Sequence, residues 1–408
     1  MISDEEIIGL LADRRQARGP RIEKLQRIAD AYNNELVLPL PELDASEEPA
    51  IANLLSMAVD AMGQRGSSVL PQVRFPSIGD SRVAAKHASA RTDLIYAWWE
   101  ANRLPLQMSK RARQFFTYAS TVVHIRPDVR RGIPLYELRD PLGAFPSGDD
   151  IVCDDCLFTY RLPLHALERR FGREGVAHSV GLPLDTHRSK LIDIVEYVDC
   201  DETVVLAYAA PQLPFGMAPV VNTDVVCTRL KRVENRLSQC PVIAVGRPGL
   251  GVPSGQFDGM VGIYWQQAML QALEVVAVKR DIFPDTYVIG ADGNNPRIVK
   301  QANGLKGEIG TIQNGDIRVL KEPPGYMTSP LIDRLERNMR VSGRIPAEFG
   351  GEAGSNIRTG ARGDAVMAAV VDFPLQEAQR FFAAGLQVEN EVAIEVDRKW
   401  FNTSKKVW

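Results

Sequence analysis

The stretch from 246 to 257 divides this sequence into two parts with different hydrophobic patterns. It opens with the letters GRPGLG, and glycine and proline interrupt both helices and strands. Before the stretch, a helical period gives way to the alternating pattern of strands, and after it long helical patterns return. The stretch therefore predicts the main domain boundary in a chain of 408 residues, a length that favours more than one domain.

The first part, residues 1–257, begins with helical patterns and continues with strand patterns. Gly19-Pro20 is expected to break its first helix into two. From 121 to 245 the apolar period becomes two, which is typical of strands. The expected fold class is therefore α+β, with helices first and a mostly antiparallel sheet after them.

Most elements of this part have clear limits in the sequence. A turn at 199–202 is expected to join two strands into a hairpin. Further helices are expected near 51–62, 82–101, 105–120 and 163–171. Strands are expected at 69–75, 121–125, 151–160, 192–198, 203–208 and 242–245.

A helix from Asp258 to about Phe283 is the most unusual element of the second part. Nearly every residue outside one narrow polar stripe is apolar. A helix of this kind has to be covered on most of its sides. Because no other large helical core lies nearby in the sequence, neighbouring subunits are the natural cover, and the helix predicts self-association.

The rest of the second part is expected to alternate strands, helices and one loop. Short strand patterns between 285 and 327 lead to Ser329, which is a good cap for a helix ending at Gly343. A glycine-rich loop follows at 346–363. A last helix is then expected from 364 to 401, with Pro374 kinking or splitting it.

Four arginines mark the helix that begins at Ser329 and the residue just beyond it. They are Arg334, Arg337, Arg340 and Arg344. The sequence leaves two interpretations open. A solvated helix face needs no partner, whereas a face that meets acidic groups of a neighbour or the phosphates of DNA would use the same charges.

No motif of an enzyme site is recognisable. The sequence has no dinucleotide-binding GxGxxG after a strand, no phosphate-binding loop with its lysine, no HExxH and no GxSxG. The glycine-rich loop lacks the preceding strand and the Gly-Lys-Ser/Thr ending that a nucleotide site requires. We therefore expect an inter-helix loop, no catalytic residues and no cofactor.

Cys153 and Cys156 have the spacing of half a zinc knuckle, but a second pair is missing. The neighbouring carboxylates of Asp149, Asp150, Asp154 and Asp155 are expected to form a solvated hairpin rather than a cation site. Five cysteines in 408 residues favour a reducing compartment over a disulfide framework. No metal site is therefore predicted.

Composition excludes several further classes of protein. A hydrophobic share of 45% and a charged share of 24% are ordinary for a folded globular chain. The formal net charge of −3 gives no global sign of a nucleic-acid binder. The acidic N-terminus does not read as a secretion signal, and the polar residues of the 258–283 helix argue against a membrane span.

The order of these elements resembles the portal proteins of tailed bacteriophages, the head-to-tail connectors, and in particular the portal family of phages of Gram-positive bacteria. Local phrases agree with the family's pattern: NLLSMAVDA at 53–61, WWEAN at 98–102 before a helix and a strand, and Asp140-Pro141 at the opening of the sheet. Each phrase is weak alone, but their order and spacing extend the resemblance over nearly the whole chain.

The resemblance assigns a role to each segment. It implies that 1–257 is the wing, 258–283 the first stem helix, 284–328 the clip, 329–345 the second stem helix and 346–363 the tunnel loop. Residues 364–408 would be the long helix toward a crown that is short or truncated. The channel would then be lined by Gly350, Gly351, Gly354, Ser355, Asn356, Arg358, Gly360 and Arg362, with a basic stem belt at Arg334, Arg337, Arg340 and Arg344.

The resemblance also implies a function without catalysis. Such proteins form a ring, here expected to have twelve subunits, at one vertex of the virion's capsid after assembly in the host cytoplasm. They conduct double-stranded DNA without sequence specificity during packaging and ejection. Their partners are the major capsid and scaffolding proteins, the terminase large subunit and the head-to-tail adaptor protein.

Two other functions remain open at the level of the sequence. One is an oligomeric metal-dependent hydrolase that uses the Cys, Asp and His residues of 149–187. The other is a smaller ring or adaptor module of a virion.

Overall fold

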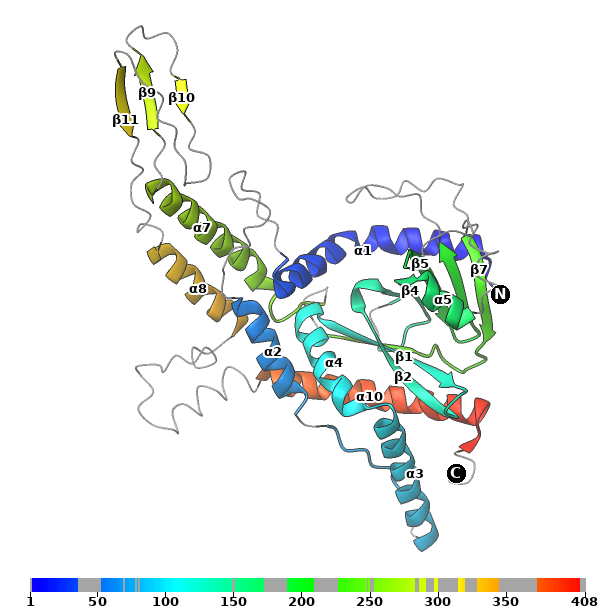
Figure 1. Cartoon of the computed structure of the whole chain (residues 1–408). Helices are drawn as coiled ribbons and strands as arrows, with labels where there is room; N and C mark the ends of the chain where they lie inside the picture. Colours follow the sequence, from blue (N-terminus) through cyan, green and yellow to red (C-terminus); the bar gives the residue numbers. More distant parts are fainter. Residues whose placement is uncertain are drawn as a thin grey trace, which may run out of the picture. The chain divides into compact units, whose positions relative to one another are not determined.

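The chain folds into two compact units, described here from a computed structural model. The first unit contains 1–28, 59–258 and 357–408, and the second contains 29–58 and 259–356. Figure 1 shows the elements of both. The structure describes residues 2–35, 53–68, 70–77, 79, 81–148, 151–171, 189–208, 227–247, 249, 253–282, 286–290, 297–299, 315–319, 329–344 and 373–403.

The helices largely follow the predicted ranges, as Figure 1 shows. They are α1 (Asp4–Asn33), α2 (Leu54–Gly66), α3 (Arg82–Ala101), α4 (Leu104–Tyr118), η1 (Pro141–Gly143), α5 (Leu164–Phe171), α7 (Asp258–Ile282), α8 (Ser329–Gly343) and α10 (Phe373–Trp400). Pro374 lies in the first turn of α10, where its missing N–H costs nothing. Whether Pro374 interrupts a longer helix is a prediction that concerns residues outside the described ranges.

The described strands form three antiparallel sheets, so the mixed α+β class with antiparallel sheets is confirmed. The sheets have the strand orders β2-β1-β8, β3-β4-β5-β6-β7 and β10-β9-β11. The strands are β1 (Ser120–Asp128), β2 (Ile133–Arg139), β3 (Ala144–Pro146), β4 (Asp155–Pro163), β5 (Leu191–Asp199), β6 (Glu202–Tyr208), β7 (Cys227–Glu234), β8 (Val242–Gly246), β9 (Thr286–Gly290), β10 (Arg297–Val299) and β11 (Gly315–Val319).

The five-stranded sheet has a different cover on each face. Side chains alternate between the faces of a strand, so Val195 and Tyr197 of β5 point to the face that packs against Ile7 and Leu11 of α1. On the opposite face, Ile194 packs with the buried leucines of α5. The same face continues to an apolar cluster shared with β1 and β8. The predicted hairpin turn at 199–202 joins β5 to β6 and is confirmed.

Helix α10 packs on the three-stranded sheet β2-β1-β8. Its buried row includes Phe382 and Leu386, spaced four residues apart as one helix face requires. Gly385 sits against the sheet, and a Cβ there would lie 2.5 Å from the side chain of Val245. The ring of Phe382 also meets that of Phe115 in α4, with centroids 5.2 Å apart. The C-terminal helix is therefore part of the core of the first unit.

The predicted break at Gly19-Pro20 is wrong, because α1 runs from Asp4 to Asn33 with Pro20 inside it. An interior proline costs a helix about 3 kcal/mol. Contacts on both sides of Pro20 offset this cost. Ile7 and Leu11 are buried before it, and Ile28 is buried after it. Tertiary packing therefore overrides the local signal.

Two further differences concern strands. The predicted strand at 69–75 is wrong, since the described residues 70–75 have no ladder partner. Within this segment the N–H of Val73 donates a hydrogen bond to the hydroxyl of Tyr96, at 3.0 Å. Conversely, the sequence interpretation missed β2, β3 and β7, which are short or rich in charged residues.

The second unit contains the predicted order of helix, small sheet and helix. Helix α7 leads to the antiparallel sheet β10-β9-β11, and α8 follows it. The strand patterns at 286–289, 297–299 and 317–320 are confirmed to within two residues. Within the described ranges, no helix combines the length and apolar character that a membrane crossing requires.

Candidate functional site

The predicted tunnel loop lies outside the residues that the structure describes. This applies to all of its predicted channel residues. They are Gly350, Gly351, Gly354, Ser355, Asn356, Arg358, Gly360 and Arg362. Their role therefore stays a prediction from the sequence.

The predicted arginine belt lies on α8, and its members have different environments. Arg334 and Arg337 are exposed, and Arg344, just past the end of the helix, is exposed as well. Arg340 is partly buried and pairs with Glu336 one turn earlier, at 2.7 Å. Helix α8 ends at Gly343, as predicted. The residue in the left-handed conformation that follows the helix is Arg344, with φ of 53°.

Helix α7 exposes large apolar side chains within a single copy of the chain. Its buried row consists of residues four apart, among them Met260, Tyr264 and Ala268. Outside that row, Trp265 and Leu273 are 37% and 42% exposed. Large exposed apolar side chains on one element are a mark of protein contact surfaces. The single chain thus leaves part of α7 uncovered, and its coverage by neighbouring subunits stays a prediction from the sequence.

Gln267, a polar residue of α7, is buried and only 5% exposed. Among the described residues, its Oε1 atom is one of the buried polar atoms without a hydrogen-bond partner. Buried amide oxygens normally find a donor, so this atom is a position where a further contact would be favourable.

The two cysteines of the half-knuckle lie in an apolar cluster. Cys153 and Cys156 are 2% and 0% exposed. The thiol of Cys153 donates to the carbonyl of Val242 at 3.3 Å and lies 4.0 Å from the sulfur of Cys240. Burial raises the pKa of Cys156. Among the residues described, no three His, Cys, Asp or Glu side chains are grouped to hold a metal ion.

A buried ion pair connects α4 to α10. Both oxygens of Glu389 accept hydrogen bonds from the guanidinium of Arg111, at 2.8 and 2.9 Å. The two side chains are only 4% and 2% exposed. Burial raises the pKa of Glu389, and the charge of Arg111 opposes that shift. Next to the pair, Asn390 accepts hydrogen bonds from Trp99 and Tyr136, which join α3 and β2 to the same helix.

A second polar cluster is buried between the two sheets of the first unit. Glu196 of β5 accepts hydrogen bonds from Arg139 at 2.6 Å and from Tyr160 at 3.1 Å. The Nδ1 atom of His124 lies 3.8 Å from the other carboxylate oxygen of Glu196. The imidazole also stacks on Phe158, with centroids 5.8 Å apart. The cluster supplies hydrogen-bond donors to the carboxylate of Glu196, which would otherwise be costly to bury.

Burial lowers the pKa of His124 to about 4, and Glu196 raises it only partly. The charges of Arg139 and Arg126 lower it further, and that of Glu137 raises it. His124 is therefore neutral in the folded protein at pH 7. Its ordinary pKa is about 6.5, so between about pH 6.5 and 4 the unfolded chain binds a proton that the folded chain does not.

We expect His124→Gln to reduce the loss of stability on acidification. As pH falls from 6.5 to 4, the protonation of His124 in the unfolded chain favours unfolding, by at most about 3 kcal/mol over that window. Urea unfolding at pH 7.0, 5.5 and 4.5 measures the effect. Glu389 has a raised pKa and contributes the opposite slope, but it is present in both proteins and cancels in the difference. Parallel pH curves for the two proteins would contradict the assignment.

These buried groups were not among the residues singled out in the sequence. Arg111 and Glu389 are separated by 278 positions, and His124 and Glu196 by 72, from which no local pattern follows. The sequence gives only a modest indication of such groups, namely a charged residue among apolar residues at helical spacing. Arg111, between Met108 and Phe115, is an example. Neither a protein-family model nor a curated protein matches the sequence.

Proposed function

We propose that this chain is the portal subunit of a tailed bacteriophage. Copies of it would form a closed ring at one vertex of the capsid, and double-stranded DNA would pass through the ring. In this proposal residues 1–257 form the wing, most of which lies in the first unit, and α10 is the long helix. The stem helices α7 and α8 and the clip lie in the second unit.

One observation carries the proposal: the second unit has the order apolar helix, small antiparallel sheet, arginine-bearing helix. Helix α7 supplies exposed Trp265 and Leu273 to a neighbouring subunit. In a closed ring with head-to-tail contacts, each subunit uses two different surfaces, so an apolar helix face in one copy is covered by the next.

The charges of α8 fit passage of DNA better than tight binding. Each copy exposes Arg334, Arg337 and Arg344, and ring symmetry would multiply them into a belt. Contacts to many phosphates would hold DNA in place, because affinity rises with each neutralised phosphate. A chain with a formal net charge of −3 and a few arginines on one helix avoids that outcome. The terminase, the capsid and scaffolding proteins and the adaptor would be its partners.

The alternative of a metal-dependent hydrolase receives no support from the part of 149–187 that the structure describes. Cys153 and Cys156 are buried among apolar side chains, whereas His165 is exposed on α5. An open coordination position for water and substrate would need ligands that converge at a surface.

The particle mass of the purified full-length chain tests the proposal. Native mass spectrometry and negative-stain electron microscopy at micromolar concentration are expected to give rings whose mass is a multiple of 45.1 kDa, with twelve copies as the expected number. A monomer or dimer under these conditions would overturn the ring. Zinc bound at one equivalent after dialysis would instead support the hydrolase.

A further inference from the structure

Two thiols meet where the two sheets of the first unit come together. Cys153 lies two residues before β4 of the five-stranded sheet, and Cys240 lies two residues before β8 of the three-stranded sheet. Their sulfur atoms are 4.0 Å apart, although the residues are 87 positions apart in the sequence. Both side chains belong to the apolar cluster shared with β1 and β8. A covalent bond between these sulfurs would join the two sheets.

The backbone around Cys153 fixes the direction of its side chain. The preceding residue, Val152, forms an antiparallel bridge with Ile243 of β8. In this register Cys153 lies beside Val242, whose carbonyl accepts a hydrogen bond from the thiol at 3.3 Å. The sulfur is therefore directed toward the segment that carries Cys240.

Cys240 is held in position by separate contacts. The N–H of Ile125 in β1 donates to the carbonyl of the next residue, Pro241, at 2.8 Å. The thiol of Cys240 donates to the carbonyl of Val198 in β5 at 3.6 Å. The proximity of the two sulfurs thus follows from strand pairing on both sides and not only from the contact between the thiols.

The distance between the sulfurs is short enough for side-chain rotation to close it. The two sulfurs of a disulfide are about 2.05 Å apart, so these two have to approach by about 2 Å. Rotation about each Cα–Cβ bond moves its sulfur, and the two rotations together can supply this approach without a change of strand register.

The two thiols differ in acidity. The hydrogen bond between them lowers the pKa of Cys153 and raises that of Cys240. The thiolate is the nucleophile in disulfide exchange, so Cys153 is the sulfur that attacks first. Cys156 belongs to the same cluster, but burial raises its pKa, and its thiol donates to the carbonyl of Leu157 at 3.7 Å. Cys156 is therefore a suitable comparison for the pair.

Only a thin layer covers Cys153. Its own side chain is 2% exposed, whereas Val152 before it is 36% exposed and Asp154 after it is exposed as well. Local opening of a short segment at the surface needs less free energy than unfolding of the whole unit. Such an opening gives a small reagent access to the thiol while both sheets stay folded.

We propose that Cys153 and Cys240 form a reversible disulfide that joins the two sheets of the first unit under oxidising conditions. The oxidant is a low-molecular-weight disulfide, such as oxidised glutathione. The proposal does not depend on the portal function or on ring formation.

The reaction proceeds by two exchanges. The Cys153 thiolate attacks one sulfur of the reagent, which gives a mixed disulfide and releases one thiolate. Cys240 then loses its proton to solvent and attacks the sulfur of Cys153, which releases the second thiolate. Two protein thiols are oxidised, and the reagent is reduced to two thiols that take up the two protons.

Incubation of the folded full-length protein with oxidised glutathione tests the proposal, followed by blocking of free thiols and peptide mapping by mass spectrometry. A pair of peptides joined through Cys153 and Cys240 is expected, lighter by two hydrogen atoms than the two reduced peptides and separated by dithiothreitol. Because the bond closes a loop of 87 residues, oxidation is expected to raise the melting temperature by about 5 °C or more.

Cys156→Ala is the matched control, because it removes a buried thiol of the same cluster and leaves the proposed pair intact. The joined peptides and the rise in melting temperature are expected to persist in this variant. Cys153→Ser and Cys240→Ala are each expected to abolish both. The two substitutions lie in different segments, so a folding defect in one, detected by circular dichroism of the reduced protein, leaves the other as the test.

Three results would overturn the proposal. The first is the absence of the Cys153–Cys240 peptides from the oxidised protein, or their formation only after urea has been added. The second is an equal yield of a link between Cys153 and Cys156. The third is a melting temperature that oxidation leaves unchanged or lowers.

Discussion

Replacing Glu389 by glutamine is expected to destabilise the first unit by about 3–5 kcal/mol. The substitution leaves the guanidinium of Arg111 buried without its counter-ion, and the desolvation cost of that charge is then uncompensated. Urea unfolding followed by circular dichroism measures the change in the free energy of unfolding. Because typical domains are stable by only about 5–15 kcal/mol, the variant will be close to its unfolding threshold at 37 °C.

Two comparisons separate a lost charge pair from a general disturbance. The double variant Arg111→Met with Glu389→Leu removes both charges and is expected to recover most of the lost stability, since apolar residues can replace a buried ion pair. Asp193→Asn breaks the pair with Arg161, whose side chains are 63% and 41% exposed, and should change stability by less than about 0.5 kcal/mol. A single-variant cost below about 1 kcal/mol would show that the Arg111–Glu389 pair is not what holds α10 to α4.

The second large effect is expected on assembly. Trp265→Ser combined with Leu273→Ser removes two of the exposed large apolar side chains of α7 and is expected to convert rings into monomers of 45.1 kDa. Buried aromatic anchors often contribute about 2 kcal/mol or more to an interface, equivalent to roughly 30-fold in affinity. In a closed ring each subunit takes part in two such interfaces, so the loss acts twice per subunit.

Val129→Ser is the matched control for assembly. Val129 is 71% exposed in the turn between β1 and β2, so the control removes an apolar side chain that is more accessible and lies on a different surface. Rings are expected to form from this variant as from the wild type. Native mass spectrometry with circular dichroism distinguishes lost assembly from lost folding. Intact rings of the α7 double variant would place the subunit contact elsewhere.

Local signals were sufficient to predict the fold where apolar periodicity and boundary residues agree. The paired tryptophans near the end of α3 and the proline at the start of α4 delimit two helices whose buried faces repeat every three or four residues. The hairpin β5–β6 was predictable because apolar runs flank a short polar turn. For each of these elements, the residues that predict it lie within ten to twenty positions of one another.

The strands that were missed are not indicated by their own local sequence. β7 is an edge strand with the sequence CTRLKRVE, in which charged residues hide the alternation that identifies an inner strand. β2 contains Glu137 and Arg139, which are accommodated by partners on other strands. At Pro20 the local rule predicts a break, but α1 continues because both of its halves are anchored to the sheet and its loops.

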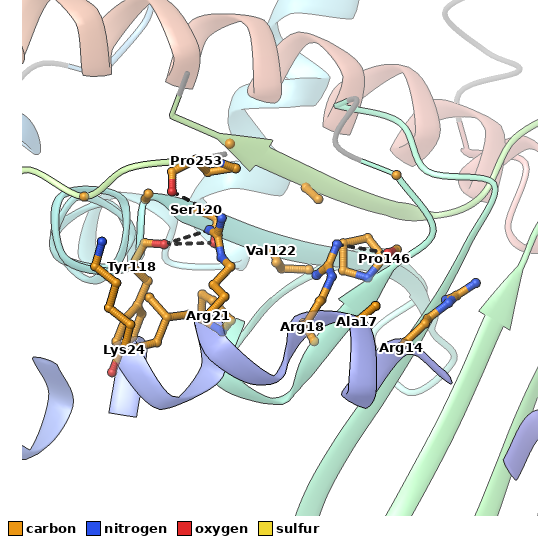
Figure 2. A pocket seen from close by; sticks show the side chains of 18 of the residues that line it. Arg14, Ala17, Arg18, Arg21, Lys24, Tyr118, Ser120, Val122, Pro146 and Pro253 are labelled. Carbon is orange, nitrogen blue, oxygen red and sulfur yellow. Dashed lines mark hydrogen bonds between the residues drawn. The ribbon is translucent and has the colours of Figure 1, made fainter. Parts of the chain in front are cut away.

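The cavity beside α1 illustrates how one such error hides a feature of the surface. Its lining includes four basic residues, Arg14, Arg18, Arg21 and Lys24 (Figure 2), which share a helix face only if the helix passes through Pro20. With a break at Gly19-Pro20, Arg14 and Arg18 belong to one helix and Arg21 and Lys24 to another. The apolar wall opposite them comes from segments more than ninety residues away, which no local pattern could bring together.

The position of α10 in the core sets the order of events during synthesis. The sheet β2-β1-β8 is complete in the chain at Gly246, but the helix that packs on it begins only at Phe373. At roughly 5–20 residues per second, the ribosome needs about 6–25 seconds to make the intervening residues. During that time the apolar side of the sheet has no intramolecular cover from α10. The first unit therefore cannot complete its core until α10 has been made, and a chaperone that shields nascent apolar surface is expected to act during this interval.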